Sequence, residues 1–393
     1  MMRAAVAVSK YVPFADPKVL EVLIANGVSS DGVGITTADV EKVTSIGTWF
    51  KGNTEITSFD EFEKFIGVTT VSVPNDTSAQ APFYNCIGLL SILLPKTLNI
   101  IGGHTFAGCT NLQNINLEDV EIVYNHAFDG CASLAIDVNM PKLKVLGNSV
   151  SAGSFRNSGI KSVSNLGSIT TLYGYATFGI FTNCTNLEKV VLPNTLTSIQ
   201  GSVFYGCTSL TSVENLHQNI TELGTYAFCS VPANLDVVLP NVTSLTTGTF
   251  KSSGITRVRL EGLSTMSGNW GGAGTQGNFA GCQNLTTVIL GESVTSLGGA
   301  EFKNCPALSY FVCQAVTPPT NGGIFQDLNA APVIYVPEIS VEDYKTATNW
   351  ATYATKINGY TELDTLPSSA ANGACYKVGD DFYVYQTNEF VKL

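Results

Sequence analysis

The sequence predicts a solenoid built mainly of short β-strands and turns (α/β or mainly β), with few helices, about 22–24 residues per turn and a helical cap at each end. Phenylalanine recurs at intervals of 22 to 29 residues, a cysteine follows it after three places in most units, and a leucine follows that cysteine after three more. The phenylalanines of the series are Phe83, Phe106, Phe128, Phe155, Phe181, Phe204, Phe228, Phe250, Phe279, Phe302 and Phe325. A unit of this length cannot bury its own apolar side, so neighbouring units must stack into one core.

The cysteines and leucines keep one phase relative to the phenylalanines. They are Cys86, Cys109, Cys131, Cys184, Cys207, Cys282 and Cys305, with Leu89, Leu112, Leu134, Leu187, Leu210, Leu285 and Leu308. Ser158 and Ser253 take the cysteine place in two units. We therefore expect the recurring residues to be structural core positions. Complete triplets are Phe106, Cys109 and Leu112, then Phe204, Cys207 and Leu210, then Phe302, Cys305 and Leu308.

Two short apolar patterns follow in each unit. The first has the form L-x-x-[IV]-x-L-P, as at 187–193, and the second has the form L-x-x-[IL]-[GQ], as at 196–200. Each is too short for a helix and is bounded by turn residues, so each indicates a strand. Similar spacings from Phe50 and from Phe62 predict degenerate coils at about 44–74, where the stack begins.

Composition excludes several classes of protein. Hydrophobic residues make up 44% of the 393 residues and charged residues only 13%, which excludes a disordered chain of low hydrophobicity and high charge. The formal net charge is −11 and no basic run occurs, so we expect no nucleic-acid binding. No apolar stretch reaches 18 residues, and the apolar run at 4–8 is short for a secretory signal, so we expect neither a membrane span nor a signal peptide in this chain.

The consensus F-x-G-C-x-x-L-x-x-[IV]-x-L-P-x-x-L-x-x-I-G resembles the BspA-type leucine-rich repeats of bacterial surface proteins over about residues 44–360. Cys313, the pair Pro318 and Pro319, and the apolar run at 334–337 are similar to that family's usual ending. The resemblance implies a leucine-rich-repeat solenoid at the cell surface or outside the cell, with a protein or glycan as its partner.

We expect four segments. They are an N-terminal helical leader or cap at 1–43, the solenoid at 44–312, a C-terminal cap with a closing helix at 313–360 and a small β-hairpin module at 361–393. In the closing helix, Ser340 and Asp343 form an S-x-x-D capping pattern, and apolar residues follow at helical spacing from Val341 to Ile357. The Y-x-V-G-D-x-F/Y-V-Y core of the last segment resembles small modules attached to phage fibre proteins.

The leader is also similar to a segment that sometimes carries a calcium loop before such repeats. If Asp39 is the twelfth loop position, then Val28, Ser30 and Gly32 stand at the first, third and fifth positions. Calcium needs oxygen ligands at those places. We therefore expect no calcium, and nothing in the sequence indicates another metal or a cofactor.

The ten cysteines and three histidines have structural interpretations. Because serine replaces cysteine in two units, we expect the in-phase thiols to be small buried hydrophobes rather than disulfides. The disulfide alternative stays open for the off-phase cysteines, which are Cys229, Cys313 and Cys375. His104 and His126 stand two places before a phenylalanine in successive units, so we expect a solvated polar column; a metal would need a third ligand, and His217 does not share this phase.

Three units carry extra residues between the second strand and the phenylalanine. This distance is nine residues from Leu146 and from Leu172 and thirteen from Met266, against five from Ile199. Insertions at one phase project from one face of a repeat protein, often the binding face. The loops hold aromatic residues, which suit contact with a glycan or a protein, although these rings could also cover the core edge. The candidate partner-binding residues are Trp270, Tyr175, Tyr173 and Phe178.

We expect a non-enzymatic recognition or adhesion protein that presents a repeat surface to a host protein or glycan. No G-x-S-x-G, H-E-x-x-H, P-loop or G-x-G-x-x-G pattern occurs, so no catalytic residue is expected. The first alternative is a phage or prophage virion fibre or decoration protein, which residues 361–393 support. The second is a carbohydrate-active enzyme or its accessory module, for which the sequence offers no positive feature.

Overall fold

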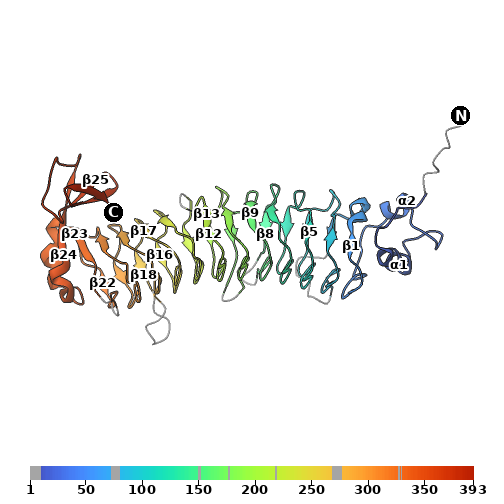
Figure 1. The fold of residues 1–393 in the computed structure, drawn as a ribbon, viewed down its shortest axis with the longest axis horizontal. Coiled ribbons are helices and arrows are strands. Elements are labelled where there is room, and N and C mark those ends of the chain that lie inside the picture. The colour runs from blue at the N-terminus through green and yellow to red at the C-terminus, as the bar shows by residue number, and fades with distance from the viewer. Residues whose placement is uncertain are drawn as a thin grey trace. The chain divides into compact units, whose positions relative to one another are not determined.

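The computed structural model describes residues 10–71, 80–148, 152–175, 178–216, 219–267, 277–325, 328 and 330–393. The chain is a parallel-strand β-solenoid of about 11 turns with few helices, which confirms the predicted fold class (Figure 1). It divides into two compact units: unit 1 is Met1–Thr195 with Cys207–Ser209, and unit 2 is Leu196–Gly206 with Leu210–Leu393. No helix in the described ranges is long and apolar enough to cross a membrane.

Unit 1 has short helices at its start and coils with two strands each. Its elements are α1 (Pro17–Ala25), α2 (Thr37–Glu41), β1 (Ser58–Phe59), the 3-10 helix η1 (Asp60–Lys64), β2 (Thr70–Val71), β3 (Ser91–Ile92), β4 (Ile100–Ile101), β5 (Asn114–Ile115), β6 (Ile122–Val123), β7 (Asp137–Asn139), β8 (Val145–Leu146), β9 (Ser162–Asn165), β10 (Thr171–Leu172) and β11 (Lys189–Val191). Parallel pairing joins β1, β3 and β5, then β2, β4, β6 and β8, and also β7, β9 and β11. The register places Ile92 beside Ile115, so buried side chains of successive coils stack.

The start of the solenoid differs from the prediction of separate degenerate coils from Phe50 and from Phe62. Phe50 and Ile56 precede β1, η1 then carries Phe62, and Val68 and β2 complete the same coil. All four side chains are fully buried. Phe62 therefore belongs to an insertion within one coil, and the two-coil prediction is wrong. Its spacing imitates a repeat because a helical turn also returns side chains to one side after three or four residues.

Phenylalanine rings stack through the interior of each unit. In unit 1, the rings of Phe83 and Phe106 are parallel within 7°, with centroids 5.1 Å apart. The stack continues through Phe128, Phe155 and Phe181 at 4.9–5.9 Å, and in unit 2 it runs from Phe204 through Phe228, Phe250, Phe279 and Phe302 to Phe325 at 5.2–5.9 Å. Each such pair contributes about 0.5–1.5 kcal/mol beyond the burial of its area.

The in-phase cysteines form hydrogen bonds between coils. The Cys131 thiol donates to the carbonyl oxygen of Phe106 in the preceding coil at 3.1 Å. The same bond joins Cys109 to Phe83, Cys184 to Phe155, Cys282 to Phe250 and Cys305 to Phe279 at 2.9–3.0 Å. The three triplets that the repeat singles out are all buried, and all ten cysteines are free, buried thiols. A thiol is thus an apolar filler that also satisfies a buried carbonyl, which leucine cannot do.

Unit 2 contains the remaining strands and a closing helical segment. Its elements are β12 (Ser198–Ile199), β13 (Ser212–Glu214), β14 (Glu222–Leu223), β15 (Asp236–Val238), β16 (Ser244–Leu245), β17 (Arg257–Leu260), β18 (Thr265–Met266), β19 (Thr287–Leu290), β20 (Ser296–Leu297), β21 (Tyr310–Cys313), β22 (Thr320–Asn321), β23 (Val333–Pro337), η2 (Glu338–Ser340), α3 (Val341–Thr346), η3 (Ala351–Lys356), β24 (Ile357–Leu363), β25 (Cys375–Val378), β26 (Asp381–Gln386) and β27 (Glu389–Lys392). Parallel sheets join β12 with β14, and β16, β18, β20 and β22.

The closing helix is shorter than the spacing predicts. Helix α3 ends at Thr346 because Ala347 is extended, with φ −66° and ψ 149°, and the chain resumes as the 3-10 helix η3. Ser340 makes no side-chain capping bond, so the predicted S-x-x-D cap does not form. The apolar residues instead anchor separate segments: Tyr344 donates to the Ala315 carbonyl at 2.8 Å, and Trp350 donates to that of Pro319 at 2.9 Å.

The C-terminal strands continue a solenoid sheet. Strand β24 pairs in parallel with both β23 and β25, and β25, β26 and β27 pair antiparallel, which completes a nine-stranded sheet beginning at β15. The hairpin lies beside the last coils (Figure 1), and its buried residues share one core with side chains of β19, β21 and β23. This core contains Ile289, Val312, Tyr335, Tyr360, Cys375, Phe382, Val384 and Leu393. Residues 361–393 are therefore built into the sheet rather than attached as a separate fibre-type module.

We expect Phe382→Ala to destabilise unit 2 by about 3–5 kcal/mol, because it leaves a cavity in the core that the hairpin shares with β19, β21 and β23. Tyr383→Ala is the matched control, since Tyr383 is half-buried and points to the other side of β26. Urea unfolding measured by circular dichroism checks this prediction. Equal losses in the two variants would contradict the shared core.

We expect Cys131→Val to cost about 1–3 kcal/mol, because valine fills the space but leaves the Phe106 carbonyl without its donor. Cys131→Ser should lose less, since the hydroxyl can still donate and the chain uses serine at this place in other units. Thermal unfolding of both variants measures the difference. A valine variant as stable as the unsubstituted protein would show that the thiol bond contributes nothing.

Candidate functional site

In each unit, the long loops leave their coils at the same place of the repeat, between the second strand and the stacked phenylalanine. In unit 1 they follow β8 and β10 and lead to Phe155 and Phe181. In unit 2 a third loop follows β18 and leads to Phe279. Trp270, which the sequence places in this third loop, lies outside the described residues. The described candidate residues therefore all belong to the loop after β10.

The three aromatic residues of that loop have different surroundings. The side chain of Tyr175 is 66% exposed and that of Phe178 is 37% exposed, whereas Tyr173 is half-buried beside the end of β10. The Phe178 amide donates to the Tyr175 carbonyl at 2.9 Å, which holds the backbones of these two residues together. Tyr175 is thus the most exposed of these three aromatic residues.

An ion pair from the neighbouring coils supports this loop. The Arg156 guanidinium donates two hydrogen bonds to the Asp129 carboxylate, from Nη2 to Oδ2 at 2.6 Å and from Nε to Oδ1 at 3.2 Å. Phe178 lies over the guanidinium, with its centroid 4.7 Å from the central carbon, and packs perpendicular to His126 at 5.9 Å. We call His126, Asp129, Arg156, Tyr175 and Phe178 the rim cluster.

Asp129 is the acceptor at the centre of the rim cluster. Besides Arg156, it accepts from Asn157 Nδ2 at 3.2 Å, and His126 Nδ1 lies 3.2 Å from Oδ2. Burial disfavours ionisation, but the hydrogen bonds from His126 and Arg156 outweigh it and hold the pKa of Asp129 below its usual value. The carboxylate is therefore charged at neutral pH and fixes both partners.

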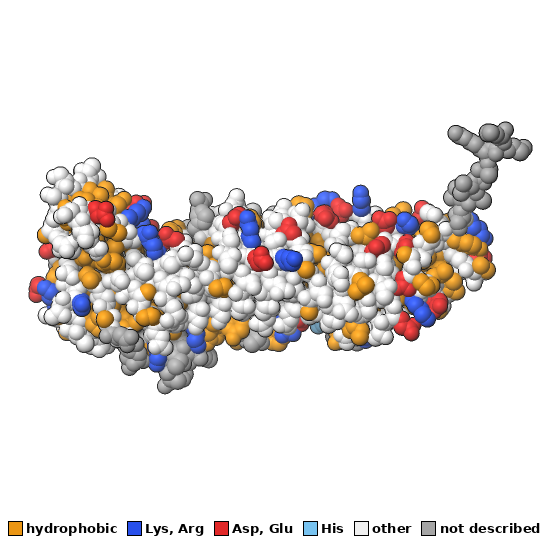
Figure 2. All heavy atoms as spheres, viewed as in Figure 1, with side chains coloured by type: hydrophobic (Ala, Val, Ile, Leu, Met, Phe, Trp, Pro, Cys, Tyr) orange, Lys and Arg blue, Asp and Glu red, His pale blue; other side chains and the backbone are white. Residues whose placement is uncertain are grey.

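The ion pair of the rim cluster could have been predicted from the repeat phase of its two residues. Asp129 and Arg156 each follow a stacked phenylalanine directly, so they occupy the same place in successive coils. In a solenoid, residues at one phase are neighbours, and opposite charges at one phase predict an ion pair. Elsewhere on the face drawn in Figure 2, acidic and basic side chains lie close together rather than in patches of one sign.

The two in-phase histidines lie next to one another at the same edge. The rings of His104 and His126 stack with centroids 4.9 Å apart, and both residues are half-buried rather than fully solvated. Within the described residues, no three histidine, cysteine or acidic side chains converge as metal ligands. His217 lies outside the described residues.

Burial keeps the thiols of Cys184, Cys313 and Cys375 in the protonated form. It raises the pKa of Cys184 and of Cys375 to about 12 and that of Cys313 to about 11. A thiol with such a pKa is neutral at physiological pH, and thiolate is the nucleophilic form of cysteine. These residues have the surroundings of core positions, not of a reactive centre.

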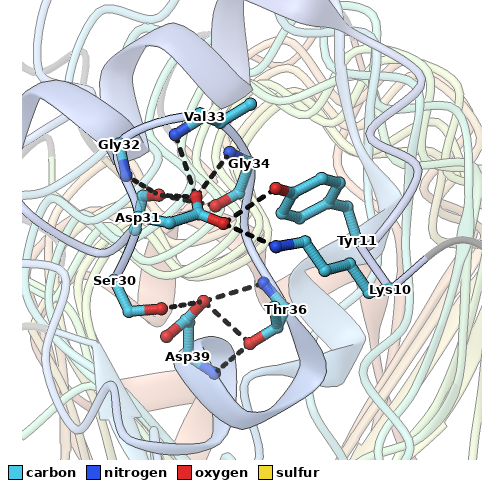
Figure 3. Close-up of polar contacts among 10 residues, drawn as sticks. Lys10, Tyr11, Ser30, Asp31, Gly32, Val33, Gly34, Thr36 and Asp39 are labelled. Atoms are coloured by element: carbon cyan, nitrogen blue, oxygen red, sulfur yellow. Dashed lines mark hydrogen bonds and ion pairs between the residues drawn. The ribbon is translucent and has the colours of Figure 1, made fainter.

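In the segment that is similar to a calcium loop, the carboxylates of Asp31 and Asp39 are bound by other groups of the protein (Figure 3). Asp31 accepts from the Val33 amide at 2.9 Å, from the Tyr11 hydroxyl at 2.7 Å and from the Lys10 ammonium at 2.9 Å. Asp39, the presumed last ligand, instead caps α2 by accepting from the amide and hydroxyl of Thr36 at 2.9 and 2.8 Å. Both carboxylates thus have structural partners, and a lysine supplies the positive charge beside Asp31.

We expect millimolar calcium to leave the melting temperature unchanged, because Lys10 and backbone amides already occupy the Asp31 carboxylate. Asp31→Ala should lower the melting temperature, since the loop loses its central acceptor. Differential scanning calorimetry with calcium and with a chelator checks both expectations. A marked stabilisation by calcium that disappears in Asp31→Ala would instead establish a metal loop.

Three comparisons relate the chain to known proteins. The family model described as the BspA type leucine rich repeat region matches in six copies, over residues 54–179, 148–269 and 275–370. No curated protein matches the chain. Among solved structures, a leucine-rich repeat protein from Bacteroides ovatus is 18% identical, with 75% of this chain and 88% of that chain covered and a TM-score of 0.37.

Two further structures are similar to this chain. The leucine-rich repeat protein of T. pallidum is 28% identical, with 42% of this chain and 70% of that chain covered and a TM-score of 0.33. A leucine-rich cell surface protein from Faecalibacterium prausnitzii is 15% identical, with 74% and 86% covered and a TM-score of 0.30. The family match extends over more than half of the chain and agrees with the repeat seen in sequence and structure, so the chain belongs to the BspA-type leucine-rich repeat family.

Proposed function

We propose that this chain is a non-enzymatic recognition or adhesion protein, located at the cell surface or outside the cell, that binds a host protein or glycan. Its membership of a repeat family supports this function, since repeat proteins bind partners through extended surfaces. The edge that carries the long loops is the proposed binding surface.

The observation that carries the proposal is the loop after β10. Tyr175 is two-thirds exposed, while Phe178 of the same turn is held against Arg156 and His126. An exposed aromatic ring on a supported loop suits recognition, because large rigid side chains give contact area at a small entropic cost. A loop that merely covered the core edge would bury this ring.

The chemistry of the described residues supports binding rather than catalysis. Asp129 is engaged by Arg156, Asn157 and His126, which leaves it poorly suited to act as a general base. The thiols with raised pKa are buried in the core. What the edge offers to a partner is an aromatic and hydrogen-bonding surface.

A ligand screen followed by substitution tests this function. The full chain is screened against glycan and host-protein arrays, and each ligand found is titrated against Tyr175→Ala and Trp270→Ala. We expect at least one of these variants to bind about tenfold more weakly, the size of effect that an interface aromatic commonly has. Ile339→Ala, which removes an 84% exposed side chain from η2, is the control. Unchanged affinity in both loop variants would exclude the loop edge as the binding surface.

A further inference from the structure

We propose that the rim cluster of unit 1 is a binding site for an acidic sugar, one whose ring carries a carboxylate. This inference rests on the proposed function, since it assigns a ligand class to the same edge. It follows from which polar groups of the cluster are already used, and from where the aromatic rings lie relative to the remaining ones.

The acceptor capacity of the rim cluster is taken up within the protein. Oδ1 of Asp129 accepts from Arg156 Nε and Asn157 Nδ2, and Oδ2 accepts from Arg156 Nη2 and faces His126 Nδ1. Asp129 is the one carboxylate among the described residues of the cluster. The Asp129 carboxylate therefore has little capacity left for the hydroxyl donors of a ligand, so a ligand would bind the cluster mainly through acceptors of its own.

The hydrogen-bond donors of the rim cluster that the protein does not use would best be satisfied by a ligand with a negatively charged acceptor. The ion pair with Asp129 uses Nε and Nη2 of Arg156 and leaves Nη1 outside the pair, on a side chain that is 25% exposed. The exposed Tyr175 adds a phenol hydroxyl. Guanidinium groups bind carboxylates with short, directional hydrogen bonds, so a carboxylate is the complementary group.

The aromatic residues favour a sugar over a flexible acidic side chain. Phe178 covers one face of the guanidinium, and the turn that carries Phe178 presents Tyr175 to solvent. The rim cluster thus contains both a charged donor and an exposed flat ring. A pyranose with a carboxylate on its ring has the matching form, since its C–H face packs on an aromatic ring while the acid meets the guanidinium.

The surrounding charges permit an anion at this edge although the chain carries a net charge of −11. Two acidic residues of the coil before Phe128 are paired with lysines: Asp119 lies 2.6 Å from the Lys142 ammonium, and Glu121 lies 2.7 Å from that of Lys144. These pairs reduce the local repulsion that an acidic ligand would meet.

The test measures binding of the full chain to defined oligosaccharides. The probes are a sialylated lactose, its methyl ester, unmodified lactose, a glucuronate-containing oligosaccharide and a glutamate-rich peptide. We expect binding to at least one of the two acidic sugars. The methyl ester of the sialylated lactose should bind about tenfold more weakly or worse, because it differs only in the carboxylate, and lactose should bind no better than the ester, because it lacks the acidic sugar altogether. Sialyl and glucuronate probes distinguish the two sources of a ring carboxylate.

Variants connect the binding to the rim cluster. Arg156→Gln and Tyr175→Ala should each weaken binding about tenfold, and Arg156→Lys should restore part of it by returning the charge. Tyr205→Ala is the matched control, since Tyr205 is a 38% exposed tyrosine that follows a stacked phenylalanine in unit 2 and packs on Tyr226. Melting temperatures show whether each variant is folded; if Arg156→Gln is not, the exposed Tyr175 still provides the test.

Each outcome decides the inference. Loss of acidic-sugar binding in the rim variants but not in Tyr205→Ala supports it. Equal binding of acid and ester, tighter binding of the glutamate-rich peptide, or binding to none of the probes overturns it. A different ligand, protein or neutral glycan, that still depends on Tyr175 would overturn the acidic-sugar site and leave the proposed function standing. If neither Tyr175→Ala nor Trp270→Ala changes the affinity of any ligand found, the acidic-sugar site and the proposed function are both overturned.

Discussion

The repeated contact between one coil and the next is the constraint on which the rest of this structure depends. A phenylalanine ring stacks on the ring of the preceding coil, and the thiol three residues later donates to that coil's phenylalanine carbonyl. The ring supplies apolar area, and the thiol supplies the donor that an interior turn needs. Because both contacts recur at one phase, the coils that carry a cysteine at this place are held in register by two independent interactions.

This register makes residues at one phase into neighbours. It brings Asp129 to Arg156 and His104 to His126, although more than 20 residues separate the partners in each case. The edge around the phenylalanines can therefore vary in chemistry without disturbing the core, and it accepts insertions that the strands could not. The recognition surface that we propose at this edge is compatible with the way the core is built.

The C-terminal part of unit 2 shows how the same coil surface is adapted when another segment covers it. In unit 1 the residues that directly follow the buried Ile92, Ile115 and Val138 are Leu93, Asn116 and Asn139. At the equivalent places of β19, β21 and β23, Ile289, Val312 and Tyr335 lie in the core shared with the hairpin. Arg259 pairs with Glu261 and Asp381 and so joins β17 to the hairpin. The hairpin covers an apolar face that would otherwise be exposed to water.

The sequence by itself determined the solenoid, the phase of its phenylalanine, cysteine and leucine residues, the strand positions and the family, because a periodic core repeats the same requirement many times and errors in one unit do not hide it. It also located the loop that carries Tyr175. It did not predict that Phe178 of that loop packs on the Arg156 guanidinium. Only the tertiary structure decided the features that occur once. The insertion of Phe62 within the first coil, the break after Thr346 and the packing of Phe382 against the last coils depend on contacts between distant segments. A single occurrence has no period, so local spacing could not distinguish these features from a repeat, a long helix or a separate hairpin.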